Sequence, residues 1–129
     1  MENLEQIRAA NALLVAERTT KADVNKLPAM IIANGLLATT AFANEKNERR
    51  QAKRPAMQAV LNGVAGHLAS PEIGILPGVT DSDMLIRQLS DRNDPGANSN
   101  RLQRATAEAL VFIGYVKRFT TKEKSNSEG

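Results

Sequence analysis

The stretch KLPAMIIANGLLATTAFA, residues 26–43, indicates a helical fold for this 129-residue chain. It is the most apolar segment, and Leu27, Ile31 and the pair Leu36–Leu37 recur at the spacing of one helix face. Alanine and leucine are plentiful in the rest of the chain, and the alternation typical of strands is missing. We therefore predict an all-α protein, a compact bundle of about five helices in a single domain.

Two residues within this stretch ordinarily disfavour a helix. Pro28 lacks a backbone N–H, and Gly35 costs roughly 1 kcal/mol relative to alanine. A helix that begins near Asp23 or Asn25 would hold Pro28 in its first turn, where the N–H has no helical partner anyway. Gly35 leaves room for the close approach of another helix. We therefore predict one helix through residue 43, opened by Pro28 and closely packed at Gly35.

Apolar periodicity predicts further helices on both sides of this segment. Leu4, Ile7, Asn11 and Leu14 are expected to share one face of the first helix. Two further apolar stripes are expected to face the core: one after Pro55 through Met57, Val60, Leu61, Val64 and Leu68, and one in the last helix through Leu102, Ala105, Ala109, Phe112, Val116 and Phe119. The helical domain is expected over residues 1–120, and the polar residues 121–129 are predicted to be a disordered tail. The other predicted elements are a helix over about 2–19, a helical region around Pro55 that ends near Leu68, a loop over 70–80, a short helix capped by Thr80 or Asp81, a loop over 91–100, and a last helix over about 99–120.

The net charge is only +3, but it is unevenly distributed. Residues 45–54, EKNERRQAKR, hold five basic and two acidic side chains, and residues 101–124 hold six basic and two acidic ones. Residues 70–100 hold two arginines and five acids. Whether a helix runs through Pro55 or begins there, the basic cluster before it stays in solvent, because charges do not extend into a core. This distribution is compatible with a polyanion-binding surface, with complementary surfaces on successive copies of the protein, or with an ordinary solvated surface.

Catalytic and metal-binding signatures are missing from the sequence. Cysteine is absent, and His67, the only histidine, is expected to be a packed or surface residue because no local carboxylate or nucleophile accompanies it. Asp81 and Asp83 are interpreted as helix-capping residues. We predict that the protein is not an enzyme, uses no cofactor or metal, and is cytoplasmic, without a signal peptide or a membrane span.

The last predicted helix carries a second stripe beside its apolar one. The stripe mixes cationic, aromatic and acidic side chains, and such a face can lie along a phosphate backbone or meet a partner protein. It can equally be a solvated face with an Arg104–Glu108 ion pair. Its members are Arg104, Glu108, Val111, Tyr115, Arg118 and Lys122.

Two segments resemble a known family. Residues 26–43 resemble the Lys-Leu-Pro…Met-Ile…Asn-Gly-Leu…Ala-Phe segment of the Cmr small-subunit family, and ATAEALVFIGYVKRFT (105–120) resembles the closing helix of that family. Tyr115 stands where many members are expected to have tryptophan. Tyrosine keeps the aromatic surface at this position. Residues 44–104 match only in their helix pattern.

The resemblance implies a non-catalytic small subunit of the type III-B CRISPR RNA-silencing effector complex. Such subunits stack head to tail as a short filament beside the backbone subunits that carry the crRNA, and they help to hold the target RNA in antiviral defence. The implied partners are the other effector subunits, the crRNA/target RNA duplex and further copies of the chain. The 26–43 helix is then expected to face the core on one side and a neighbour on the other. The candidate RNA-binding residues are Lys26, Arg49, Arg50, Lys53, Arg54, Lys117 and Arg118, of which Lys26, Lys117 and Arg118 lie in the matched segments.

Three alternatives remain open from the sequence. One is the small subunit of the sister type III-A complex, another is a helical DNA-binding regulator, and the third is a protein interaction module whose basic residues meet acidic protein surfaces. The long loops at 70–80 and 91–100 fit a helix-turn-helix poorly.

Overall fold

The computed structural model describes residues 3–91 and 99–120, and all the regular elements in these ranges are helices. The predicted all-α class is confirmed, with six helices instead of about five. The predicted tail and most of the predicted loop at 91–100 lie outside the described residues. The helices are α1 (Leu4–Ala16), α2 (Lys21–Asn34), α3 (Leu36–Ala43), α4 (Pro55–Ala69), α5 (Ser82–Ser90) and α6 (Ser99–Phe119).

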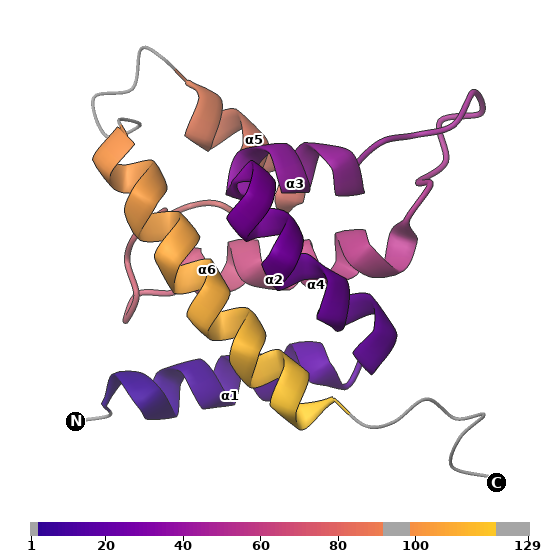
Figure 1. Ribbon diagram of the computed structural model, residues 1–129. Helices are drawn as coiled ribbons and strands as arrows, with labels where there is room; N and C mark the ends of the chain where they lie inside the picture. The colour runs from indigo at the N-terminus through magenta and orange to yellow at the C-terminus, as the bar shows by residue number, and fades with distance from the viewer. Residues whose placement is uncertain (1–2, 92–98, 121–129) are drawn as a thin grey trace, which may run out of the picture.

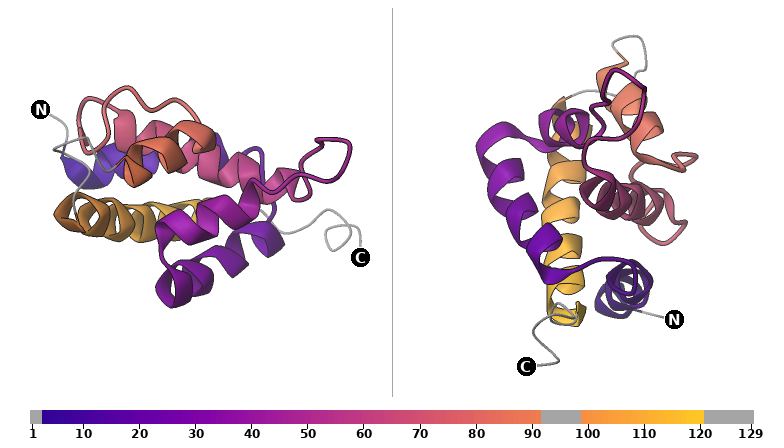
Figure 2. Two further views of the ribbon diagram at one scale, coloured as in Figure 1. Left: turned by 90° about the horizontal axis from the view of Figure 1, so that it is seen from above. Right: turned by 90° about the vertical axis from the view of Figure 1, so that its right-hand side faces the viewer.

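The helices form two layers around one core. Seen from above, α1, α4 and α5 lie in one layer and α2, α3 and α6 in the other (Figure 2). The long α6 crosses the molecule diagonally and packs against α1, α2, α3 and α4 (Figure 1). Its side chains Phe112, Ile113 and Val116 are fully buried, and so is the stripe Val60, Leu61, Val64 and Leu68 of α4. The apolar stripes predicted for these two helices therefore form the centre of the core.

The predicted role of Pro28 as a helix start is wrong. Helix α2 begins at Lys21, after the cap residue Thr20, so Pro28 lies in its interior. Because proline has no N–H, the carbonyl of Val24 lacks the usual amide partner four residues later. The buried side chains of Val24, Leu27 and Ile31 offset that cost, which is about 3 kcal/mol for proline in a helix.

The prediction of one continuous helix to residue 43 is also wrong. Gly35 has φ +93° and ψ 160°, which ends α2 and turns the chain into α3. A Cβ at Gly35 would meet no atom within 4 Å, so this glycine serves the turn and not a close contact. The close approach occurs elsewhere, at Gly63 of α4, where a Cβ would lie 2.4 Å from Cγ2 of Val15.

Other predictions about helix ends and faces have mixed outcomes. Pro55 opens α4, and Asp81 caps α5 by accepting a hydrogen bond of 2.9 Å from the amide of Met84. The first helix buries Ile7, but Leu4 is 44% and Leu14 is 63% exposed, so the predicted buried face is wrong at these two positions. The buried face of α1 instead follows Ile7, Ala12 and Ala16, because the small alanines let α1 lie close to its neighbours.

Candidate nucleic-acid interface

Residues 44–54 form a hairpin-like loop that joins the two layers and projects beyond them (Figures 1 and 2). Lys46 and Ala52 form an isolated antiparallel bridge, and the amide of Lys53 donates to the carbonyl of Glu45 at 3.0 Å. Within the tip, the side-chain oxygen of Asn47 accepts hydrogen bonds from the amides of Arg49 (2.8 Å) and Gln51 (3.0 Å). These bonds give the loop a defined shape, and we call residues 44–54 the basic hairpin.

The basic hairpin presents cations to solvent. The predicted RNA-binding residues Arg49 and Arg50 are exposed at its tip, where Arg50 adopts a left-handed conformation with φ 65°. Lys46 is also exposed in the hairpin and adds a cation that the candidate set leaves out. Lys53 is half exposed and lies 4.0 Å from Glu45, a distance typical of a weak surface ion pair.

Arg54, at the base of the hairpin, is held by several contacts. One nitrogen, Nη1, donates to the carbonyl of Phe42 at 2.9 Å and to the carboxylate of Glu45 at 3.0 Å. The guanidinium carbon lies 3.5 Å from the centre of the Phe42 ring, a cation–π contact. Arg54 therefore fixes the hairpin to the end of α3. Its side chain remains 30% exposed.

The remaining candidates lie on two helices. Lys26 is exposed on α2 and lines a hollow that Arg54 also lines. Lys117 and Arg118 are exposed in the last turn of α6, which lies near α1 and apart from the hairpin (Figure 1). The structure thus brings the hairpin cations together and places Lys26 and Arg54 on the lining of one hollow, but it leaves the α6 pair separate. Lys122 of the predicted second stripe lies outside the described residues.

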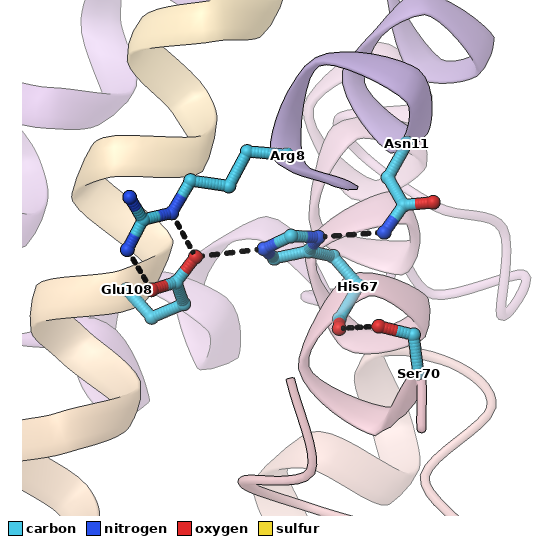
Figure 3. Close-up of polar contacts among 5 residues, drawn as sticks. All are labelled: Arg8, Asn11, His67, Ser70 and Glu108. Carbon is cyan, nitrogen blue, oxygen red and sulfur yellow. Dashed lines mark hydrogen bonds and ion pairs between the residues drawn. The ribbon is translucent and has the colours of Figure 1, made fainter. Parts of the chain in front are cut away.

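A second polar cluster, inside the molecule, joins α1, α4 and α6 (Figure 3). Arg8 binds Glu108 through two hydrogen bonds of 2.7 Å, from Nε and from Nη2. Nε2 of His67 lies 2.9 Å from the same carboxylate, and Nδ1 lies 3.0 Å from the amide nitrogen of Asn11. The His67 ring also stacks on Phe112 with a centroid distance of 4.1 Å. Glu108 therefore binds Arg8 and His67 in place of the predicted partner Arg104.

The environment shifts the pKa of two groups in this cluster. Burial lowers the pKa of His67 because it penalises the charged ring, and the hydrogen bond to Glu108 only partly opposes this effect. Burial alone would raise the pKa of Glu108, but the hydrogen bonds from Arg8 and His67 and the charge of Arg8 outweigh it, so the pKa is lowered. Neutral His67 thus donates from Nε2 to an ionised Glu108 and accepts at Nδ1 from Asn11.

The cluster suits a structural role better than a chemical one. The His67 side chain is fully buried, and both of its ring nitrogens already have partners within the protein. Ser70, the nearby hydroxyl, donates to the backbone carbonyl of His67 and not to its ring. His67 was predicted to be a packed or a surface residue, and the structure shows that it is packed, although the sequence pattern did not reveal the carboxylate that orients it. A signal was available: Glu108 lies three residues after Ala105 and four before Phe112, which is a core-facing position.

Neither a metal site nor a membrane-spanning helix is found in the part of the chain that the structure describes. Within residues 3–91 and 99–120, no three acidic or histidine side chains are grouped to hold a metal ion. In the same ranges, no helix combines the length and the apolar character needed to cross a membrane.

Comparison with known proteins identifies the family. A family model described as CRISPR-associated protein (Cas_Cmr5) matches residues 4–123. No curated protein and no solved structure matches the chain. The match spans both resembling segments and the whole region between them, so the chain belongs to this family of CRISPR-associated Cmr small subunits.

Proposed function

We propose, on the premise that the chain is a Cmr small subunit, that it is a non-catalytic part of a type III-B CRISPR effector complex in the cytoplasm. In this proposal it stacks in successive copies beside the subunits that carry the crRNA. It helps to hold target RNA through phosphate contacts that do not depend on sequence, and it thereby serves antiviral defence. The type III-A alternative and the DNA-binding regulator are less well supported, because the matching family is the Cmr one.

The observation that carries the RNA-holding part is the projection of the basic hairpin beyond both helix layers (Figure 2). Lys46, Arg49 and Arg50 are exposed on it, away from the core that fixes the rest of the chain. Long cationic side chains on a protruding loop can approach phosphate oxygens from several directions, which suits binding without base readout. Further proposed contacts lie on α2, at the base of the hairpin and on α6: Lys26, Lys53, Arg54, Lys117 and Arg118.

Stacking of copies needs two different surfaces on one subunit, because a head-to-tail contact is heterologous. The hairpin and the loop between α4 and α5 lie at opposite ends of the molecule (Figure 1). Beside that loop, Leu4, Ile73 and Val111 line a groove of about 380 Å³. On the outer face of α2, Ile32 is 74% exposed, an apolar side chain that a neighbour would cover. The unlike ends and the exposed Ile32 support stacking. The acidic side chains Glu72, Asp81 and Asp83 of the middle segment are exposed, and Asp83 accepts a hydrogen bond from the side chain of Asn44 at the base of the hairpin.

The test compares target RNA binding by complexes assembled with variant small subunits. With Arg49→Ala/Arg50→Ala, we expect the log–log salt dependence of binding to become shallower by roughly 0.7 for each RNA phosphate that the variant no longer binds. The matched control is Arg18→Ala/Arg87→Ala, which removes two exposed arginines away from the hairpin and should leave the slope unchanged.

Two results would contradict the proposal. An unchanged salt slope in an intact complex would show that the hairpin does not contact RNA. Failure of the variant subunit to join the complex, with RNA loading of the remaining subunits unchanged, would assign the hairpin to a protein partner.

A further inference from the structure

A hollow of about 560 Å³ lies beside the base of the basic hairpin, between α2, the end of α3 and the start of α4. Its size falls within the range of small-molecule sites. The side chains that matter for its chemistry come from all three helices and the hairpin base: Asp23, Lys26, Met30, Phe42, Arg54 and Met57. Asp23 and Met57, the first and last of these residues, are 34 positions apart in the sequence, so only the fold brings the set together.

The cation at the wall of the hollow, Arg54, is held by three contacts. Arg54 is held at one edge by the carbonyl of Phe42 and the carboxylate of Glu45, and on one face by the Phe42 ring at 3.5 Å. These contacts keep the guanidinium plane in one orientation, while 30% of the side chain remains exposed. A fixed planar cation beside an aromatic ring is a surface on which a nucleobase stacks, because base, ring and guanidinium are all flat.

The rest of the lining separates into an apolar part and a charged part. Met30 and Met57 supply thioether side chains, which adapt to flat aromatic partners. Lys26 is exposed on α2 and offers an ammonium to a phosphate. Asp23 is the single carboxylate of the lining, and it already accepts a 2.7 Å hydrogen bond from the hydroxyl of Thr20. The apolar part thus suits a base and the lysine suits its phosphate.

We propose that this hollow seats one unstacked nucleotide of single-stranded RNA, with the base against Arg54, Phe42 and the two methionines and the phosphate at Lys26. The inference rests on the proposed RNA-holding function and adds to it a site for a base next to the phosphate-binding hairpin. Any base can stack in this hollow, so binding there requires no recognition of the RNA sequence. A side chain of a neighbouring protein is the competing occupant, and the experiment separates the two.

The chain carries its own reporters for the test. Of its four methionines, Met30 and Met57 line the hollow, whereas Met84 lies on α5 and accepts a hydrogen bond from Thr80. In a sample with ¹³C-labelled methionine methyl groups, uridine monophosphate and then a short oligouridylate are added to the full chain. We expect ring-current shifts of the Met30 and Met57 methyl signals and no shift of Met84.

Variants assign the contacts. Phe42→Leu keeps an apolar side chain at a position already 36% exposed and removes the ring, so the dissociation constant for oligouridylate should rise roughly fivefold or more. Lys26→Gln should weaken the binding of uridine monophosphate but not of uridine. Lys21→Gln, on the same helix but outside the lining, is the matched control and should change neither. The methyl spectrum of each free variant verifies that it is folded.

Three outcomes would overturn the seat. Unmoved Met30 and Met57 signals at saturating oligouridylate would show that no base enters the hollow. Equal shifts with inorganic phosphate would make it an anion site only. Shifts with N-acetyltryptophanamide but not with uridine monophosphate would assign it to a protein side chain. The salt-slope experiment on the hairpin is independent, so failure of the seat and failure of the RNA-holding proposal are distinguishable.

Discussion

Replacing Glu108 by leucine tests whether the buried cluster holds α1 to the rest of the bundle. The change keeps most of the side-chain volume and removes the acceptor of three donors, two from Arg8 at 2.7 Å and one from His67 at 2.9 Å. His67 is fully buried, so its N–H cannot turn to water, and an unsatisfied buried donor costs about 1–3 kcal/mol. Arg8 is 20% exposed and can turn outward, so breaking its pair costs closer to the ~1 kcal/mol of a surface pair.

Together these terms give a decrease of about 3 kcal/mol in the free energy of unfolding. For a domain of this size, the melting temperature should then fall by roughly 10 °C. Urea and thermal denaturation followed by far-UV circular dichroism measure both quantities. The control Glu72→Leu removes an exposed carboxylate and should change stability by no more than about 0.5 kcal/mol. In the double variant Arg8→Met/Glu108→Leu, the decrease should be smaller than the sum of the two single decreases, because no arginine is left without its partner. A decrease below about 1 kcal/mol for Glu108→Leu, or strict additivity in the double variant, would refute the reasoning.

The structure supports further predictions about pH and packing. The lowered pKa of His67 means that the unfolded chain binds a proton more readily, so stability is full above the ordinary histidine value of 6.5 and falls as the pH drops below it. The urea midpoint should therefore fall between pH 7.5 and pH 5.5, and by less in His67→Phe, since the chain has no other histidine; equal falls in both proteins would contradict this. The lowered pKa of Glu108 adds a further decrease as the pH falls through its ordinary value of 4.5. Gly63→Ala places a Cβ 2.4 Å from the stiff Val15 side chain and should destabilise the protein, whereas Gly66→Ala, on the same helix with nothing within 4 Å, should stabilise it by up to about 1 kcal/mol. Thermal melts of the two alanine variants test the packing of α1 on α4, and equal melting temperatures would count against it.

Part of the fold was predictable because α4 and α6 each carry their own apolar stripe. The stripe through Val60, Val64 and Leu68 predicted the buried face of α4, and the one through Ala109, Phe112 and Val116 predicted that of α6. The first helix was less predictable, because Leu4 and Leu14 match the spacing but stay exposed. Alanine side chains that face a neighbouring helix can be as fully buried as leucine side chains. A hydrophobic pattern does not reveal which helix packs against that face.

The candidate interface was predicted in composition but not in arrangement. Clustered charge identified residues 45–54 as solvent-exposed, and Arg49 and Arg50 are exposed in the hairpin. The contact of Arg54 with Phe42 was not predictable, because it depends on how the hairpin returns to the end of α3. The same holds for the hollow shared by Lys26 and Arg54, which come from different elements.

The helical class, the buried faces of α4 and α6, the exposed basic segment and the family resemblance can all be inferred from the amino-acid sequence. These depend on local spacing and composition, which each segment carries independently of its neighbours. Only the tertiary structure decided that Glu108 meets Arg8, 100 positions away, and His67, 41 positions away. It also decided that Pro28 lies inside a helix and that Gly35 ends one. Packing energy from distant segments outweighs the local preference of Pro28, whereas Gly35 follows the local preference of glycine for a helix end. Packing also selects contact partners that no local pattern specifies.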